Sequence, residues 1–162
     1  MDIIVQNNLR GSNGMPDTTD SKKLHKLPIG IKLNGIPYTA LLVDDSLTAR
    51  EILKRILLSV QFKIIDEANN GELAVNKITA SKIAPDFIFI DMEMPLMDGI
   101  ETIKKIKPLL PETKIIMVTS HSEKDMVTEL LKLGVHGYVK KPYDRDTVIK
   151  KIASILGRPM QD

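Results

Sequence analysis

Short apolar segments alternate with helix-like segments from residue 39 onward, and this alternation limits the possible folds more than any other feature of the sequence. Five segments have the length and apolar content of buried strands, at residues 39–45, 62–68, 86–91, 114–120 and 136–141. After the first strand, apolar residues recur every three or four positions, which is typical of the buried face of a helix. They are Ala49, Ile52, Leu53, Ile56, Leu57 and Val60. Repeated strand–helix units predict an α/β fold with a doubly wound parallel sheet covered by helices on both faces.

Polar residues and glycines predict where several helices begin and end. Ser122 and Asp144 are expected to cap the last two helices, because short oxygen-bearing side chains accept hydrogen bonds from free helix N–H groups. Gly134 follows the first of these two helices, at a position where glycine is typical. Two shorter helices are expected over residues 71–78 and 99–107. The last helix is expected to be buried through Val148, Ile149, Ile152, Ile155 and Leu156.

The N-terminal part has a different composition. Residues 1–27 are expected to form a flexible tail, since from residue 6 onward they are rich in Asn, Gly, Ser, Thr, Asp and Lys without hydrophobic periodicity. Residues 28–38 carry Asn34-Gly35 between two short apolar arms, which favours a β-hairpin because both residues tolerate positive φ. Pro37 removes one donor from the second arm. We expect this hairpin at the N-terminal end of the first strand.

Composition excludes several classes of protein. The chain has 162 residues and no cysteine, which excludes disulfides and thiolate metal sites and favours a cytoplasmic location. Residues 1–36 hold five Lys/Arg and three Asp/Glu, and residues 37–162 hold 18 of each sign. The folded part is therefore neutral, and we expect no nucleic-acid partner. No apolar run is long enough for a signal peptide or a membrane span, so we expect no membrane insertion.

Chemically useful side chains stand where the predicted strands end. Asp44 and Asp45 end the first strand, Asp91 the third, Thr119 the fourth and Lys141 the fifth. Ligands of open parallel sheets bind outside the carboxyl ends of the strands, so these residues are expected to meet. Three carboxylates in one place repel one another, and Mg²⁺ would relieve this repulsion. An ionised Asp91 with a lysine and a hydroxyl nearby is suited to phosphoryl transfer.

Each of these residues also has an ordinary structural interpretation. Paired aspartates after a strand are common as capping or turn residues, and Lys141 alone would be a solvated edge residue. Three nearby methionines, Met92, Met94 and Met97, are read as loop and gap-filling residues rather than as a soft-metal site. The three histidines are scattered without metal-ligand spacing. Only the joint occurrence of these residues at the ends of the strands favours a functional site over these structural roles.

The chain resembles the receiver domains of response regulators, the phosphoacceptor modules of two-component signalling. The resemblance rests on "LLVDDS" (41–46), "FIFIDMEMPLMDG" (87–99), "MVTS" (117–120) and "GYVKKP" (137–142). It implies a flavodoxin-like (βα)5 fold with five parallel strands in the order 2-1-3-4-5. The receiver domain is expected over residues 39–157, with a short C-terminal tail at 158–162.

The resemblance also implies a role for each matching residue. Asp91 resembles the phosphorylated aspartate. Asp44 and Asp45 resemble the acidic pair that binds Mg²⁺ together with Asp91 and the backbone carbonyl of Glu93. Thr119 and Lys141 resemble the residues that bind the phosphoryl group. Thr119 and Tyr138 resemble the switch pair that transmits phosphorylation to the surface.

Two further expectations concern the edges of this site. The Lys141–Pro142 peptide bond is expected to be cis, because the turn must direct Lys141 back into the site and prolyl bonds isomerise at low cost. Glu93 and His121 each follow a strand-end residue by two positions. They are expected to flank the path by which water reaches the phosphorus atom and so to influence the lifetime of the phosphoryl group.

The function expected from these observations is that of a single-domain response regulator. The partners are a histidine kinase, which supplies the phosphoryl group, and a downstream protein, either a motor switch or a phosphotransfer protein. Such a chain is not an enzyme in the usual sense, although it assists its own phosphorylation and dephosphorylation. A phosphorelay shuttle and a phosphorylation-independent scaffold remain open. An aspartate-nucleophile phosphatase is disfavoured. Such an enzyme has a second acid two residues after the nucleophile, but the side chain of Glu93 is longer than expected there, and no cap domain is predicted.

Overall fold

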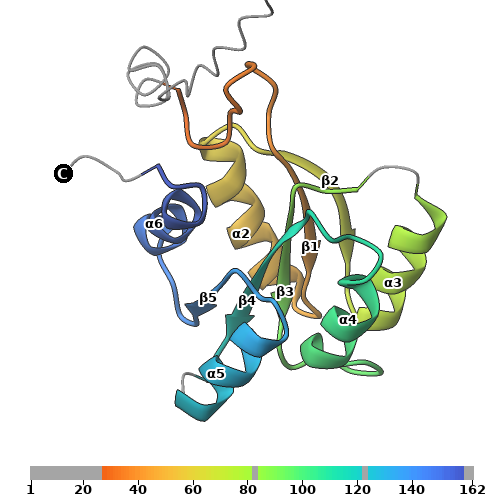
Figure 1. Ribbon diagram of the computed structural model, residues 1–162. Helices are drawn as coiled ribbons and strands as arrows, with labels where there is room; N and C mark the ends of the chain where they lie inside the picture. Colours follow the sequence, from red (N-terminus) through yellow and green to blue (C-terminus); the bar gives the residue numbers. More distant parts are fainter. Residues whose placement is uncertain (1–26, 82–83, 122–123, 159–162) are drawn as a thin grey trace, which may run out of the picture.

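The computed structural model describes residues 27–81, 84–121 and 124–158, and these form one parallel sheet with helices on both faces (Figure 1). The predicted strand order β2-β1-β3-β4-β5 is confirmed. The strands are β1 (Thr39–Val43), β2 (Lys63–Ala68), β3 (Phe87–Asp91), β4 (Lys114–Thr119) and β5 (Gly137–Lys140). The helices are α2 (Leu47–Ser59), α3 (Gly71–Ala80), α4 (Gly99–Ile106), α5 (Lys124–Lys132) and α6 (Arg145–Ile155). None of these helices is long and apolar enough to cross a membrane.

Two separate hydrophobic layers hold the sheet between the helices. Alternate side chains of each strand point to opposite faces, so neighbours such as Leu41 and Leu42 enter different layers. On one face α2 and α6 pack against Phe87 and Phe89. On the other face α3, α4 and α5 pack against the β3 residues Ile88 and Ile90. The third strand is buried along its whole length, and its last residue, Asp91, is therefore fixed by the core of the domain.

The helix ends follow the sequence closely. Asp144 accepts a hydrogen bond from the Thr147 backbone N–H and caps α6, as predicted. Gly134 has a φ of +81°, and the amide that follows it donates to the Leu130 carbonyl, so the predicted end of α5 is confirmed. The predicted cap Ser122 lies outside the described residues.

The prediction that Ile52 lies on the buried face of its helix is wrong. Ile52 is 48% exposed, whereas its neighbours Leu53, Ile56 and Leu57 are buried. The apolar stripe of α2 is wider than the surface that the sheet offers, and Ile52 lies at its edge. There it lines a small groove with Pro142 and Tyr143.

The segment before β1 contains a turn that differs from the predicted one. Gly35 has a φ of +83°, but Asn34 has no positive φ. The Gly35 N–H donates to the Lys32 carbonyl, and the Lys32 N–H donates to the Ile36 carbonyl. This is a three-residue loop with glycine in the left-handed position, rather than a two-residue turn with two positive φ values. The arms share a single antiparallel bridge, between Ile31 and Pro37.

The two ends of the described chain meet through Arg158, the first residue of the predicted short C-terminal tail. Arg158 is 9% exposed, and its guanidinium donates to the carbonyls of Leu27 at 2.7 Å and Ile31 at 3.0 Å. A guanidinium presents several donors in one plane, which suits a turn of backbone carbonyls. Residues 27–31 are therefore attached to the end of α6, at the edge of the sheet where β1 begins (Figure 1).

Candidate functional site

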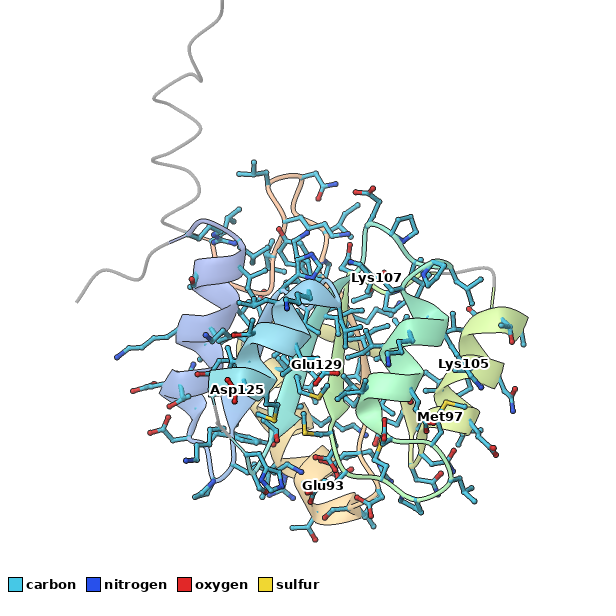
Figure 2. All side chains as sticks on the ribbon, turned by 60° about the horizontal axis from the view of Figure 1, so that its bottom comes forward. Glu93, Met97, Lys105, Lys107, Asp125 and Glu129 are labelled. Atoms are coloured by element: carbon cyan, nitrogen blue, oxygen red, sulfur yellow. The ribbon has the colours of Figure 1, made fainter. Side chains whose placement is uncertain are left out.

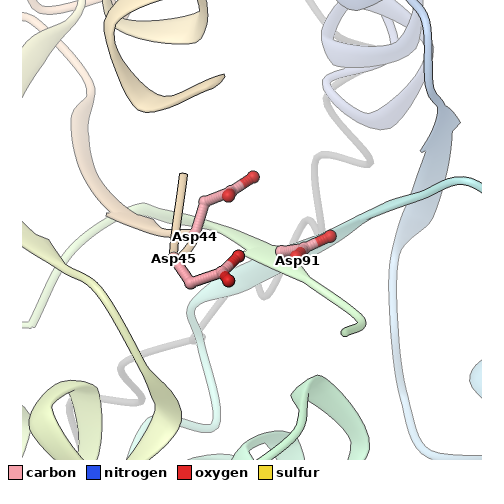
Figure 3. Close-up of side chains that lie close together, drawn as sticks. All are labelled: Asp44, Asp45 and Asp91. Carbon is pink, nitrogen blue, oxygen red and sulfur yellow. The ribbon is translucent and has the colours of Figure 1, made fainter. Parts of the chain in front are cut away.

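Three carboxylates gather where β1 and β3 end (Figure 3). The two strands are paired in parallel with Val43 opposite Ile90, so Asp44 comes level with Asp91. Oxygen atoms of Asp44, Asp45 and Asp91 lie within 4.8 Å of one another. Asp44 and Asp91 are buried and Asp45 is exposed, so the cluster opens to solvent on one side. This set of hard oxygen ligands at the surface end of a buried strand fits a divalent cation.

The backbone of the β1–α2 turn fixes Asp44. Its Oδ1 accepts a hydrogen bond from the Ser46 N–H at 2.9 Å, and Ser46 itself caps α2. The carbonyl of Asp44 accepts from the Arg50 guanidinium at 2.6 Å, while Arg50 also pairs with Glu67 on β2. Asp44 is therefore positioned by the start of α2 as well as by its strand.

Lys141 supplies the positive charge of the site. Its ammonium nitrogen lies 2.9 Å from Asp44 Oδ2 and 3.0 Å from Asp91 Oδ1. The backbone N–H of Lys141 donates to the Thr119 carbonyl at 2.7 Å, which joins the end of β5 to the end of β4. The Lys141–Pro142 peptide bond is cis, as predicted.

Burial and charge act together on the ionisation of these groups. Burial raises the pKa of Asp91, the hydrogen bond from Lys141 opposes this, and the charges of Asp44 and Asp45 add to the rise. Burial also disfavours the charged form of Lys141, but its hydrogen bonds to Asp44 and Asp91 outweigh that effect and raise its pKa. Lys141 is therefore protonated at neutral pH. One ammonium cannot neutralise three carboxylates, and the remaining negative charge is what a divalent cation would balance.

Thr119 lies in the site, but its hydroxyl is bonded elsewhere. The side chain is 1% exposed. Its Oγ1 donates to the sulfur of Met92 at 3.7 Å and accepts from the His121 backbone N–H at 3.0 Å. The sequence predicts Met92 only as a loop or gap-filling residue, because nothing in the pattern indicates that its sulfur reaches the end of β4.

Tyr138 is half-buried on β5, opposite Met117 of β4. Its ring packs against the layer that α5 covers, and the ammonium of Lys151 from α6 lies 5.3 Å from the ring centre. The aromatic ring is thus in contact with Lys151 of α6 on one side and with the hydrophobic layer on the other.

Glu93 and His121 meet across an open groove beside the carboxylates. His121 Nε2 lies 2.6 Å from Glu93 Oε1, and both side chains are exposed. The groove is lined by Asp45, Met92, Glu93, Met94, Pro95, Asp98, Ile100, His121 and Met126. Figure 2 shows Glu93 at the end of the molecule that comes forward, away from Lys107 near the other end of α4. Both side chains line this groove, and their influence on a phosphoryl group stays a prediction.

Glycine allows the loop after β3 to return to the site. A Cβ on Gly99 would lie 2.4 Å from the carbonyl oxygen of Asp91, so no other residue fits without displacing the backbone. The Gly99 N–H also donates to the Met92 carbonyl at 2.9 Å. The first residue of α4 is therefore packed directly on the backbone that carries Asp91.

Comparison with known proteins decides the family. The sequence model of the protein family "response regulator receiver domain" matches residues 40–153 of this chain. The chain belongs to this family. Receiver domains are signalling proteins that work through phosphorylation, and they are not conventional enzymes.

The most similar proteins include regulators of chemotaxis. Over 131 residues the chain is 35% identical to the chemotaxis protein CheY of Treponema pallidum, covering 81% of this chain and 91% of that one. It is 38% identical to CheY of Halobacterium salinarum, covering 72% and 94%. Among solved structures, CheY in the CheX–CheY–BeF3–Mg complex of Borrelia burgdorferi has a TM-score of 0.76 and 34% identity, covering 80% and 97%. These likenesses extend over nearly the full length of the relatives.

The segment before β1 is partly shared with the Treponema protein. That alignment takes in 131 residues of this chain, whereas residues 40–153 number only 114. Nine residues follow Ala153, so at least eight of the aligned residues precede Ala40. The turn at Gly35 therefore lies within the region of similarity.

Proposed function

We propose that this receiver domain accepts a phosphoryl group on Asp91 from the phosphohistidine of a histidine kinase. The observation that carries the proposal is the place of Asp91. It is a buried carboxylate at the tip of the central strand, 3.0 Å from the Lys141 ammonium and beside two further acids. We further propose that Mg²⁺ binds to Asp44, Asp45, Asp91 and the backbone carbonyl of Glu93.

The proposed reaction is a displacement at phosphorus. A carboxylate oxygen of Asp91 attacks the phosphorus atom, the bond from phosphorus to the imidazole nitrogen breaks, and its electron pair stays on the imidazole. Mg²⁺, when bound, supplies positive charge to the phosphoryl oxygens. Lys141 binds a phosphoryl oxygen and keeps Asp91 ionised before the reaction, since its hydrogen bond opposes the rise of the Asp91 pKa. Hydrolysis then requires only a water molecule in line with the new bond.

The output we propose is phosphorylation-dependent binding to another protein. Thr119 would bond to the phosphoryl group, and Tyr138 would respond through the contacts of β5 with β4. The surface affected is that of α5, β5 and α6. The relatives named as chemotaxis proteins favour a motor-switch regulator over a phosphorelay shuttle. The absence of cysteine is in keeping with a cytoplasmic location.

Phosphorylation by a small phosphodonor tests the proposal directly. The protein is incubated with Mg²⁺ and acetyl phosphate, and intact mass is expected to show one added phosphoryl group that is lost in alkali. Asp91→Asn should gain none. Asp98→Asn, an acid of the same loop that caps α4, is the matched control and should react like the wild type.

Two results would count against the proposal. Labelling of Asp91→Asn at the same stoichiometry would place the phosphoryl group elsewhere. A wild type that never gains a phosphoryl group would favour a phosphorylation-independent scaffold. For the output route, backbone amide shifts on phosphorylation are expected in α5, β5 and α6. Shifts confined to α3 and β2 would contradict that route.

A further inference from the structure

The hydroxyl of Thr119 has two partners in the site, and one of them is a sulfur atom. Its proton is directed at Met92 Sδ, 3.7 Å away, and its oxygen accepts from the His121 N–H. Neither bond reaches Asp91 or Lys141. Because Thr119 is 1% exposed, water cannot take the place of either partner.

The backbone of Met92 is held on both sides, which fixes where its side chain begins. The Met92 N–H donates to the Val118 carbonyl of β4 at 3.1 Å, and the Met92 carbonyl accepts from the Gly99 N–H at 2.9 Å. From this position the half-buried side chain reaches across to Thr119 at the end of β4.

A thioether is a weak hydrogen-bond acceptor, and this matters for a hydroxyl that must change partners. A buried hydroxyl without an acceptor would be costly, whereas one bonded to an amide or carboxylate oxygen would be hard to release. Sulfur lies between these extremes. It satisfies the hydroxyl before phosphorylation, and a phosphoryl oxygen, which is a much stronger acceptor, can take its place.

We propose that Met92 is a positioning residue that holds the Thr119 hydroxyl in the unphosphorylated protein and thereby sets how readily Thr119 moves to a phosphoryl group on Asp91. The inference rests on the proposed function, since it concerns the same site. It predicts that the acceptor strength of residue 92 controls the affinity for the phosphorylated state.

The test uses Mg²⁺ with beryllofluoride as a stable analogue of the phosphoryl group, and measures its affinity for the full chain by calorimetry. Met92→Leu removes the acceptor and should bind the analogue roughly two- to fivefold more tightly, the range for loss of one weak hydrogen bond. Met92→Gln offers an amide oxygen and should bind more weakly than the wild type. The two variants change affinity in opposite directions, so a general loss of folding cannot produce both results.

A second set of variants separates positioning from packing. In a Thr119→Val background, which lacks the hydroxyl, both substitutions at Met92 should leave the affinity unchanged. In a Thr119→Ser background, which keeps the hydroxyl, their effects should return. Met94→Leu makes the same chemical change at another methionine of the groove and should leave the affinity as in the wild type.

The outcomes are distinguishable. Failure of the wild type to bind the analogue overturns the proposed function, and this inference with it. Binding by the wild type, with effects of Met92→Leu that persist in the Thr119→Val background or are matched by Met94→Leu, overturns the role of Met92 alone.

Discussion

The ammonium of Lys141 lies 3.0 Å from Asp91 Oδ1, although the two residues end different strands that are not neighbours in the sheet. The same ammonium reaches Asp44, so one cation serves two buried carboxylates. Even so, burial is the largest effect on Asp91 and raises its pKa despite Lys141. The ionised form of Asp91 is therefore less favourable in the folded protein than in the unfolded chain.

Asp91→Asn is expected to stabilise the protein when no metal is bound. Because the folded pKa lies above the unfolded value, ionised Asp91 lowers the free energy of unfolding at neutral pH, and this cost disappears as pH falls below the ordinary value of 3.8. We expect a gain of about 0.5–2 kcal/mol at neutral pH, typical of removing an unfavourable charge. Urea denaturation at several pH values measures it.

Magnesium should stabilise the wild type more than it stabilises Asp91→Asn. A cation that binds only the folded form stabilises it, and the wild type retains all three carboxylates. Added Mg²⁺ should therefore raise the melting temperature of the wild type more than that of Asp91→Asn. Asp98→Asn serves as the control and should behave as the wild type. A lower stability of Asp91→Asn at neutral pH without metal would contradict the argument.

The Glu93–His121 contact should lengthen the life of the phosphoryl group. The two side chains meet at 2.6 Å beside the groove that contains Asp45, and we expect water to approach the phosphoryl group on Asp91 from this groove. A contact between two exposed polar side chains contributes about 0.2–1 kcal/mol, so Glu93→Gln or His121→Ala should speed the loss of the phosphoryl group by at most about fivefold. Intact mass followed over time gives the rate.

Glu101→Gln is the control for this experiment, since Glu101 is an exposed acid in the first turn of α4 and does not line the groove. It should leave the rate unchanged. The double variant should lose the phosphoryl group no faster than the quicker single variant, because the two side chains act as one contact. Single variants with wild-type rates would refute the role of the pair.

Much of the fold and the site could be predicted from local signals in the sequence. Buried parallel strands are continuous apolar runs, and Asp91 ends the most apolar of them. Once a parallel sheet is expected, its carboxyl edge is the place to look for ligands, and this rule brings Asp44 and Lys141 to the same point. Asp144 and Gly134 were predictable because capping depends on neighbours in the chain.

The features that sequence analysis missed depend on contacts between distant segments. Ile52 matches the helical period, but its exposure depends on how much of α2 the sheet can cover. Arg158 resembles a solvated terminal residue until the backbone carbonyls of residues 27–31 are brought to it. The sulfur of Met92 acquires its role only because β4 places Thr119 within reach.

Gly99→Ala should slow phosphorylation by more than its loss of stability would explain. The added Cβ would lie 2.4 Å from the Asp91 carbonyl and must push that backbone away from the site. Gly71→Ala is a matched control, because its Cβ would meet the Thr102 hydroxyl and the Met97 carbonyl instead. Both should lose about 1–3 kcal/mol of stability, as overpacked positions do. Only Gly99→Ala should also phosphorylate several times more slowly at temperatures where both are folded. Equal rates would show that Asp91 tolerates the displacement.

Asp86 should contribute stability from the opposite end of the sheet without affecting the chemistry. Its Oδ2 accepts hydrogen bonds from the Thr39 N–H and hydroxyl at 2.8 and 2.9 Å, and its Oδ1 lies 2.7 Å from the Lys32 ammonium. Burial opposes ionisation of Asp86, but the bonds from Lys32 and Thr39 outweigh it and lower the pKa. Asp86→Asn should therefore lower the free energy of unfolding at neutral pH by about 1–3 kcal/mol.

The pH dependence of that loss identifies its cause. A carboxyl whose folded pKa is depressed stabilises the protein above its unfolded value, here 3.8, and the contribution is lost as pH falls through the lower folded value. The difference between wild type and Asp86→Asn should thus shrink in acid, whereas a packing defect would persist. Lys32→Met removes one of the bonds and should reproduce part of the loss. Phosphorylation should proceed at the wild-type rate in both variants, since the length of β3 separates Asp86 from Asp91. A slower rate at equal folded fraction would show that the segment before β1 is coupled to the site.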